Sequence, residues 1–324
     1  MKTLQDPTLV KKNVELKTLL SNLQNLADID FWRTLNPFAA ITDFEFSQYL
    51  SPRRADADDI DEYLGQLREE RYFQTPTLIP QTLIKEMRQC IDNVRNAGFP
   101  VMFALLYDVF YEGLACFDPV VSAALGRHYR LIPNFWLYYI GTSDEETGFQ
   151  PHRDTEYTDT IDENGLPSVL TLWIAVTDAT PLNSCIYLVP ANRDAKYEQA
   201  LHTLDKVSIE LFPLENIRAL PAPAGSLSCW DQYLLHWGSR SSKRAKEPRI
   251  SYAFYCQRGD RADVDDACID LSARLSFETR LALVCRGLRR YSRMNRQITE
   301  EYRPVFTFLE SAEAHLRPGP PQIS

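Results

Sequence analysis

Two histidines and one aspartate stand at spacings that could hold a divalent metal ion. His152 and Asp154 lie in the segment GFQPHRDTEYTDT, residues 148–160, with Arg153 between them, and His236 follows downstream. In an extended chain, residues i and i+2 project to the same side, so His152 and Asp154 could bind one ion while Arg153 points away. Two histidines and one carboxylate on one face of an octahedron form the ligand set typical of non-haem Fe(II) oxygenases. That set leaves positions open for a chelating cosubstrate and dioxygen.

The second histidine of such a site must come from a distant strand that lies beside the first in the folded chain. His236 stands in the apolar run YLLHWG, where a lone histidine is more often a core residue than a ligand. Its position after a strand-like run, combined with the His152–Asp154 pair, favours the ligand interpretation. The remaining histidines have no such partners and are interpreted as surface or core residues: His128, His202 and His315.

An arginine downstream of His236 could bind an anionic cosubstrate. Arg249 begins the run RISYAFYC, which has the composition of a buried strand. A buried guanidinium there could form a bidentate pair with a dicarboxylate. The nearby cations Arg240, Lys243 and Arg244 lie in a polar loop and are expected to face solvent.

The elements that must position these residues are predicted to be strands. Residues 100–260 contain short apolar or alternating runs rich in aromatic and β-branched residues, separated by turn residues. No long helix alternates with these runs, so an antiparallel sandwich or jelly roll fits better than a parallel sheet. The predicted strands are contained in VMFALLYDVF, LIPNFWLYYIG, SVLTLWIAV, CIYLVP, GSLSCW, LLHWG and RISYAFYC.

Helical patterns flank this region. Apolar residues recur at helical spacing over residues 14–35 and 83–94, and an arginine-rich helical pattern covers residues 280–304. The arginines could bind an anion, but a solvated helix face that pairs with an acidic body is the favoured interpretation. We therefore predict one domain that is mainly β with flanking helices. It would have a helical N-terminal part (1–99), a jelly-roll core (100–260) and a helical C-terminal extension (261–324).

Composition narrows the function classes. The chain has 324 residues and a net charge of −9, which argues against a nucleic-acid partner. Its seven cysteines include no C-x-x-C pair, which is typical of buried thiols in a reducing compartment. The sequence has neither a signal-peptide pattern nor an apolar stretch long enough to span a bilayer. A cytoplasmic protein without membrane contact is expected, with the oligomeric state left open.

Residues from about 65 to 260 resemble the phytanoyl-CoA dioxygenase (PhyH) family of Fe(II)/2-oxoglutarate-dependent oxygenases. The matching pieces, in family order, are RYFQTPTLIPQTLIKEMRQCID, PHRDT, LTLWIAVTDAT, IYLVPANRD, PAGSLSCWDQYLLHWGS and EPRISYAFY. The resemblance implies a double-stranded β-helix (jelly-roll, cupin-like) core with iron held by His152, Asp154 and His236. It also implies that Arg249 receives the distal carboxylate of 2-oxoglutarate and that Trp173 lines the same pocket.

Two details depart from the family pattern. Family members usually carry a serine two residues after the distal histidine, where this chain has Gly238, with Ser239 one position further. The cosubstrate arginine usually follows that histidine by about eleven residues, whereas Arg249 follows by thirteen. A slightly longer loop after His236 would account for both departures, and Ser239 would then be a candidate cosubstrate contact. Asn134 and Tyr138 on a predicted strand are further candidates.

The expected activity is oxidation, most simply hydroxylation, of a C–H bond in a small-molecule metabolite or natural-product intermediate. Fe(II) would be the cofactor, with 2-oxoglutarate and O2 as cosubstrates and succinate and CO2 as products. Asp154 favours oxygen transfer, because related halogenases lose this carboxylate. Alternatives are desaturation, cyclisation or demethylation by the same site, a dioxygenase without 2-oxoglutarate, an oxygenase of proteins or nucleic acids, and a non-catalytic jelly-roll binding protein.

Overall fold

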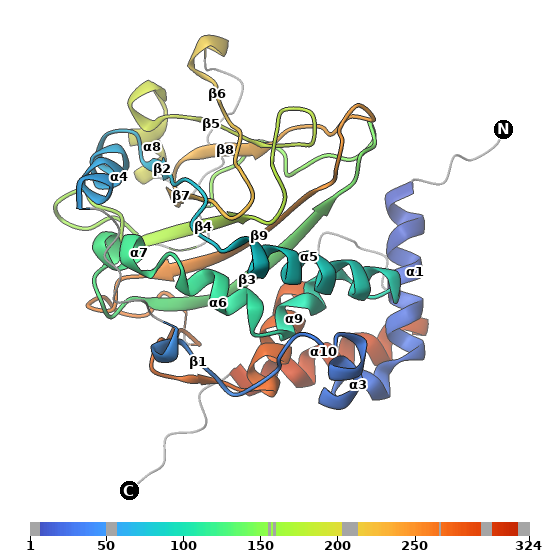
Figure 1. Ribbon diagram of the computed structural model, residues 1–324. Helices are drawn as coiled ribbons and strands as arrows, with labels where there is room; N and C mark the ends of the chain where they lie inside the picture. Colours follow the sequence, from blue (N-terminus) through green and yellow to red (C-terminus); the bar gives the residue numbers. More distant parts are fainter. Residues whose placement is uncertain are drawn as a thin grey trace, which may run out of the picture.

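Two antiparallel sheets form the core of the chain, with helices packed on the outer face of the larger one (Figure 1). The computed structural model describes residues 7–49, 57–154, 157, 160–202, 213–265, 267–292 and 300–316. Within this part of the chain, no helix has the length and apolar character needed to cross a membrane.

The larger sheet has six strands, all paired antiparallel. All nine residues of its strand β9 are buried, because both faces of the sheet are covered. In spatial order the strands are β10 (Ile269–Asp270), β3 (Arg130–Ile140), β9 (Arg249–Gln257), β4 (Val169–Ala175), β7 (Leu227–Asp231) and β2 (Tyr72–Gln74).

The smaller sheet lies against the inner face of the larger one. Its strands, in spatial order, are β6 (Arg218–Leu220), β5 (Ile186–Val189) and β8 (Leu235–Gly238). Apolar residues from both sheets, among them Trp173 and Leu188, form one buried cluster between them. The two facing antiparallel sheets make the core predicted from the sequence. A separate two-stranded ribbon pairs β1 (Phe44–Glu45) with β11 (Arg274–Leu275).

Helices cover the outer face of the larger sheet (Figure 1). Helix α5 (Gln81–Asn96) buries the apolar stripe that the sequence predicts. Gly98 adopts a left-handed φ of 83° just after the end of this helix. The other α-helices are α1 (Pro7–Ser21), α2 (Leu23–Leu26), α3 (Ile29–Leu35), α4 (Ala57–Glu69), α6 (Val109–Ala115), α7 (Asp118–Leu125), α8 (Tyr197–Leu201), α9 (Phe277–Ser292) and α10 (Arg303–Glu313). The 3-10 helices are η1 (Phe46–Gln48), η2 (Val101–Leu106), η3 (Ala191–Arg193), η4 (Leu214–Asn216), η5 (Glu300–Tyr302) and η6 (Ala314–Leu316).

Two secondary-structure predictions were wrong. The run VMFALLYDVF was predicted to be a strand, but it forms η2 and the start of α6. Residues 102–106 are buried all round, and a continuous apolar run does not distinguish a buried helix from a buried strand. The pattern over residues 14–35 is split into α1, α2 and α3. The last of these begins where Asp28 caps a new helix by accepting a hydrogen bond from the Asp30 amide (2.9 Å).

Three of the C-terminal arginines, Arg280, Arg286 and Arg289, pair with acidic residues, as the favoured interpretation expected, but they are largely buried and do not form a solvated helix face. Arg286 contacts Asp265, and Arg289 lies 2.8 Å from Glu310. Arg280 differs, because it is completely buried and lies 2.6 Å from Asp108. Residues 293–299 of the predicted arginine-rich pattern and the tail 317–324 lie outside the described residues.

Candidate metal centre

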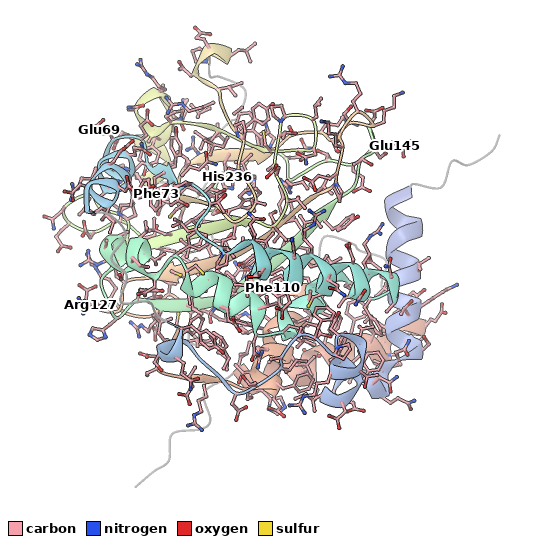
Figure 2. The ribbon with its side chains drawn as sticks, viewed as in Figure 1. Glu69, Phe73, Phe110, Arg127, Glu145 and His236 are labelled. Atoms are coloured by element: carbon pink, nitrogen blue, oxygen red, sulfur yellow. The ribbon has the colours of Figure 1, made fainter. Side chains whose placement is uncertain are left out.

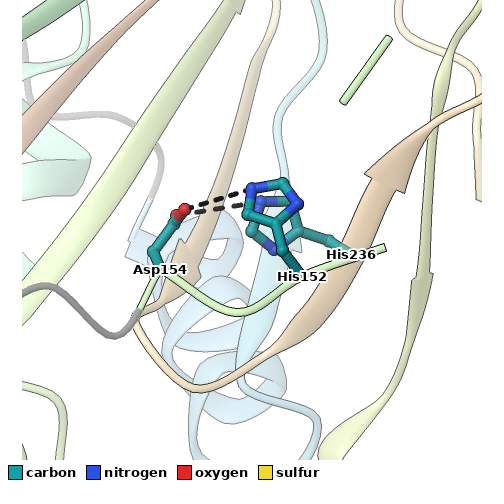
Figure 3. Close-up of side chains that lie close together, drawn as sticks. All are labelled: His152, Asp154 and His236. Carbon is teal, nitrogen blue, oxygen red and sulfur yellow. Dashed lines mark ion pairs between the residues drawn. The ribbon is translucent and has the colours of Figure 1, made fainter. Parts of the chain in front are cut away.

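His152 and His236 lie side by side on neighbouring backbone segments. Each backbone amide donates to the carbonyl of the other residue at 3.0 Å, which forms an isolated antiparallel bridge at the edge of β8. The two imidazole centroids are 4.3 Å apart. The sequence predicted that a distant strand would bring the second histidine beside the first, and the structure brings the two together (Figure 3).

Asp154 completes a three-residue cluster with the two histidines. His152 Nε2 lies 3.4 Å from Asp154 Oδ1, and His236 Nε2 lies 3.7 Å from Asp154 Oδ2. One potential ligand atom from each residue lies within 4.8 Å of the others. Among the described residues this is the one group of three histidine, cysteine or carboxylate side chains close enough to hold a metal ion.

Backbone carbonyls set the tautomer of both histidines. His152 Nδ1 lies 2.7 Å from the Gln150 carbonyl, and His236 Nδ1 lies 3.0 Å from the Leu234 carbonyl. A carbonyl oxygen only accepts hydrogen bonds, so each Nδ1 carries the proton. Each Nε2 therefore presents its lone pair toward Asp154, as a metal-binding imidazole requires.

Burial and neighbouring charges prepare the three groups for a cation. Burial lowers the pKa of His236 to about 4, and the opposing effect of Asp154 is smaller, so the imidazole is neutral at neutral pH. Burial alone would raise the pKa of Asp154. The two histidines and a hydrogen bond from Thr171 outweigh it and hold that pKa below its ordinary value. The cluster thus offers a neutral His236 imidazole and one carboxylate anion, with the His152 imidazole beside them.

Two donors on adjacent strands hold one oxygen of Asp154. Thr171 Oγ1 donates to Asp154 Oδ2 at 2.8 Å, and Trp230 Nε1 donates to the same oxygen at 3.1 Å. Thr171 on β4 and Trp230 on β7 are directly opposite each other in the sheet register. Gln232 Nε2 in turn donates to Thr171 Oγ1 at 3.0 Å. With Oδ2 engaged in this way, Oδ1 is the oxygen available for a metal ion.

Thr171→Val is expected to weaken metal binding by about 10- to 100-fold, the usual cost of losing a hydrogen bond to a metal ligand. The variant keeps the side-chain shape but loses the donor to Asp154 and the acceptor for Gln232. Thr160→Val is the matched control, because the buried Thr160 hydroxyl has no hydrogen-bond partner among the described residues. Fe(II) titration of both variants checks this. Equal affinities would show that the Thr171 hydrogen bond does not support the site.

Arg153, between the two ligands, points away from the cluster as predicted. Its Nη2 donates to Asp194 Oδ2 at 2.6 Å, and its Nη1 donates to the Tyr233 carbonyl. Tyr233 lies in the turn between β7 and β8 that leads to His236. Arg153 therefore ties the segment that carries two ligands to the turn that precedes the third.

Arg249 is a buried cation that has no acidic partner in the described part of the chain. Only 2% of its surface is exposed, and none of the described carboxylates forms an ion pair with it. Its Nη1 donates to the Ser184 carbonyl at 2.8 Å, whereas its Nε is buried without a hydrogen-bond partner in the described part of the chain. Burial lowers the pKa of Arg249 to about 10. Unpaired buried charges are costly, so this guanidinium is suited to an anion that the described residues do not supply.

Two of the predicted cosubstrate residues lie beside Arg249. The guanidinium carbon is 5.5 Å from the Tyr138 ring centroid and 5.6 Å from that of Trp173. Asn134 lies in the irregular part of β3, where the register with β9 shifts between Ile132 and Trp136. On a regular strand, residues an even number of positions apart share a face, so Asn134 and Tyr138 would point the same way. The register shift between them interrupts this alternation, and a cosubstrate role for Asn134 stays a prediction.

Ser239 follows the end of β8, and its carbonyl accepts hydrogen bonds from the Gly148 amide (3.1 Å) and the Ser184 hydroxyl (2.5 Å). Its own hydroxyl is buried without a hydrogen-bond partner among the described atoms. A cosubstrate role for Ser239 also stays a prediction.

A close backbone contact explains why this chain has glycine where the family usually has serine. A Cβ on Gly238 would lie 2.7 Å from Gly148 Cα, and one on Gly148 would lie 2.5 Å from Gly238 Cα. The segment before His152 therefore packs directly on the end of β8, with no room for a side chain at either position. Gly148 was not singled out in the sequence, because this contact depends on a long-range strand pairing.

Gly238→Ser is expected to lower the free energy of unfolding by about 1–3 kcal/mol, the usual cost of overpacking. Gly65→Ser is the control, because a Cβ on Gly65 in α4 would meet no atom within 4 Å. Chemical denaturation of the metal-free proteins measures both. A Gly238→Ser protein as stable as the Gly65→Ser protein would mean that the glycine contact is easily relieved.

Ser251 is a further polar residue near Arg249 that sequence reasoning missed. It lies two residues after Arg249 on β9, hence on the same face, and is directly opposite Tyr138 in the register. Its hydroxyl is completely buried and has no hydrogen-bond partner among the described residues. The spacing Arg-x-Ser on a predicted strand was the signal available in the sequence.

Comparisons with known proteins support the fold and the family resemblance. Residues 109–247 match the family model described as Phytanoyl-CoA dioxygenase (PhyH), as predicted. The sequence has no significant match among curated proteins. The non-heme monooxygenase ThoJ, solved in its apo form, is 13% identical with a TM-score of 0.53, over 78% of this chain and 98% of its own. At this identity the likeness concerns the fold, and with the family match it confirms the predicted mainly β, jelly-roll class.

Two further solved structures are similar. The non-heme alpha ketoglutarate dependent epimerase SnoN from nogalamycin biosynthesis is 14% identical with a TM-score of 0.49, over 64% of this chain and 91% of its own. HygX from Streptomyces hygroscopicus, solved with nickel and 2-oxoglutarate bound, is 14% identical with a TM-score of 0.41, over 61% of this chain and 87% of its own.

Proposed function

We propose that this chain is a non-haem Fe(II)- and 2-oxoglutarate-dependent oxygenase that hydroxylates a C–H bond of a small molecule. The observation that carries the proposal is the combination of two features inside one jelly roll. One is a cluster of two imidazoles and one carboxylate, and the other is a buried arginine that forms no ion pair with a described carboxylate. Neither feature alone would distinguish an oxygenase from a metal-binding protein of another kind.

The donor set fits Fe(II). His152, His236 and Asp154 would be its ligands, through the two Nε2 atoms and Oδ1. Two nitrogens and one oxygen supply half of an octahedral sphere and leave the other half for small molecules, which is typical of the 2-His-1-carboxylate oxygenases. Structural zinc sites, in contrast, usually have four protein ligands and no cysteine lies in this cluster.

The surroundings of Arg249 fit one end of a dicarboxylate. Arg249 Nε and the Ser251 hydroxyl are buried donors without partners among the described residues, and they lie on the same face of β9. We infer that both would donate to the distal carboxylate of 2-oxoglutarate, with Tyr138 and Trp173 flanking the guanidinium. Ser251 would then perform the task that a serine at position 238 performs in the family.

The bound iron and 2-oxoglutarate would together supply the oxidant, with succinate and CO2 as products. The chain would contribute the placement. Thr171 and Trp230 orient Asp154, the two backbone carbonyls fix the imidazole tautomers, and Arg249 binds the far end of the cosubstrate in a dry environment. The presence of Asp154 favours hydroxylation over halogenation, whereas desaturation, cyclisation or demethylation would use the same groups.

The proposal predicts slow 2-oxoglutarate turnover even without a primary substrate. The purified protein, loaded with Fe(II) in air, is expected to release succinate from 2-oxoglutarate, and removal of the metal with a chelator is expected to stop this. Succinate and CO2 are measured with and without a panel of small molecules. A metal-loaded protein that forms no succinate under any condition would instead favour a non-catalytic jelly-roll binding protein.

A further inference from the structure

A short turn connects the two sheets next to the metal cluster. Residues 232–234, which we call the connecting turn, join β7 of the larger sheet to β8 of the smaller one. Thr171 and Trp230 hold Asp154 from the larger sheet. His236 lies on β8, in the interior of the molecule (Figure 2). The shape of the connecting turn therefore sets the position of His236 relative to Asp154.

Two backbone carbonyls of the connecting turn accept hydrogen bonds from the segments that carry the proposed ligands. The Leu234 carbonyl accepts from His236 Nδ1 at 3.0 Å, which leaves Nε2 of that ring as the metal-binding atom. The Tyr233 carbonyl accepts from Arg153 Nη1. Arg153 stands between the other two proposed ligands in the sequence, so a shift of the Tyr233 carbonyl would move the segment that carries both.

A side chain of the connecting turn supports the carboxylate ligand as well. Gln232 Nε2 donates to Thr171 Oγ1 at 3.0 Å, and Thr171 Oγ1 donates to Asp154 Oδ2 at 2.8 Å. Gln232 is completely buried, so its side chain follows the position of the turn backbone. Every residue of the connecting turn thus has a hydrogen bond that leads to the metal cluster.

Asp231, the last residue of β7, holds the connecting turn in shape. Its Oδ1 accepts hydrogen bonds from the amides of Tyr233 and Leu234, both at 2.9 Å. The Leu234 amide and the Tyr233 carbonyl belong to one planar peptide group, so the bond to Oδ1 also fixes the direction of that carbonyl. Asp231 therefore acts on the same backbone groups that hold Arg153 and His236.

The other oxygen of Asp231 is anchored outside the turn. The Tyr197 hydroxyl of α8 donates to Asp231 Oδ2, and Arg71 Nε lies 4.0 Å from the same oxygen. The carboxylate is completely buried, and burial raises its pKa to about 6. Burying a carboxylate is costly unless it is hydrogen-bonded, and these contacts engage both of its oxygens. The side chain is thus held rigidly enough to fix the turn.

We propose that Asp231 is a positioning residue for the metal centre, because it holds the connecting turn whose hydrogen bonds orient His236 and the segment around Arg153. The inference rests on the proposed function, because it gives the turn a task in holding Fe(II). Asp231 lies outside the group of candidate ligands and acts through the turn. The task requires an acceptor oxygen at the place of Oδ1, whereas the negative charge of the side chain is not required.

Substitutions of Asp231 test this inference by anaerobic Fe(II) titration at about pH 8, above the pKa of about 6 of this carboxyl. Asp231→Ala removes the acceptor of both turn amides and is expected to weaken Fe(II) binding at least about tenfold, as for other groups that support a metal ligand. Asp231→Asn keeps an acceptor oxygen for the two amides, and its Nδ2 can donate to the Tyr197 hydroxyl. This variant is expected to bind Fe(II) nearly as tightly as the wild type.

Asp162→Ala is the matched control. Asp162 is also a buried aspartate whose Oδ1 accepts from two amides of a turn, those of Asn164 (2.9 Å) and Leu166 (2.8 Å). That turn precedes β4 and lies outside the connection from β7 to β8. Asp162→Ala is expected to lose stability in chemical denaturation but to keep the Fe(II) affinity of the wild type.

The tautomer of His236 gives a second readout, which needs no metal. In metal-free protein with isotope-labelled histidine, NMR shows which ring nitrogen carries the proton, and His236→Ala identifies the His236 signals among those of the five histidines. The wild type and Asp231→Asn are expected to carry this proton on Nδ1, beside the Leu234 carbonyl. Asp231→Ala is expected to shift it in part to Nε2, which lies 3.7 Å from Asp154 Oδ2. A general loss of stability would not change this ratio.

Wild-type Fe(II) affinity and an unchanged tautomer in Asp231→Ala would overturn the inference. Equal losses in Asp231→Asn and Asp231→Ala would also overturn it, because the charge would then matter and not the acceptor oxygen. A loss of the same size in Asp162→Ala would show a general effect of destabilisation. If Asp231→Ala does not fold, Asp231→Glu replaces it, because it keeps the charge but displaces the carboxylate from the two amides, and the same losses are expected.

The wild-type Fe(II)–2-oxoglutarate chelate is recorded by visible absorption in the same series. If the chelate forms and the variants give any of the contradicting results, the inference fails while the proposed function stands. If the wild type forms no chelate, the proposed function fails, and the inference fails with it.

Discussion

His236→Ala is expected to lose stoichiometric Fe(II) binding while the chain still folds. The imidazole is one of three proposed ligands. Its loss should therefore lower iron affinity by more than the roughly 10–100-fold that follows from changing a residue hydrogen-bonded to a ligand. The ring packs between His152 and Trp230, at 4.3 and 4.6 Å, and its removal leaves a small gap. We expect a destabilisation of about 1–3 kcal/mol, within the usual range for a buried substitution.

The measurement is iron content after anaerobic loading, with circular dichroism and thermal unfolding of the metal-free protein as the test of folding. His202→Ala is the control, because His202 is exposed and lies outside the cluster. A folded His236→Ala protein that still binds one iron with wild-type affinity would show that the ligand assignment is wrong.

Arg249→Met is expected to have opposite effects on cosubstrate binding and on stability. Removing one partner of a buried charge pair typically costs about 2–5 kcal/mol, so affinity for 2-oxoglutarate should fall by roughly 30-fold to several thousand-fold. In the metal-free protein, however, Arg249 is a buried charge that pairs with none of the carboxylates the structure describes. Replacing such a charge with an apolar side chain of similar length should leave the protein at least as stable.

Arg280→Met provides a matched comparison, because Arg280 is also buried but pairs with Asp108 at 2.6 Å. Breaking that pair leaves the Asp108 carboxylate buried and unpaired, so Arg280→Met should cost about 3–5 kcal/mol. Calorimetric titration with 2-oxoglutarate and chemical denaturation distinguish the two variants. If Arg249→Met were destabilised as strongly as Arg280→Met and kept its 2-oxoglutarate affinity, Arg249 would be a structural residue.

Two of the three metal-binding candidates could be predicted from local spacing, and the third from its place in a strand-like run. The spacing of His152 and Asp154 follows from the two-residue repeat of extended chain, and the apolar runs on either side of His236 indicated a strand. Only five histidines are present, so few combinations were possible. The division of the chain into a core at 100–260 and helical flanks remains a prediction.

The groups that orient the ligands could not be predicted, because they depend on which strands are neighbours. Thr171 and Trp230 meet at Asp154 only because β4 pairs with β7 in one particular register. The unpaired state of Arg249, the contact of Gly148 with Gly238, and the position of Ser251 opposite Tyr138 likewise arise from long-range packing. Of this information, local sequence patterns contain only the Arg249-x-Ser251 spacing, which places both residues on one face of a strand.

Anaerobic titration with Fe(II) and 2-oxoglutarate, followed by visible absorption, tests the central claim most directly. We predict that the wild-type chain forms one Fe(II)–2-oxoglutarate chelate per chain, that His236→Ala forms none, and that Arg249→Met forms it only at a much higher 2-oxoglutarate concentration. A wild-type protein that binds iron without forming the chelate, or a chelate of equal strength in all three proteins, would contradict the account.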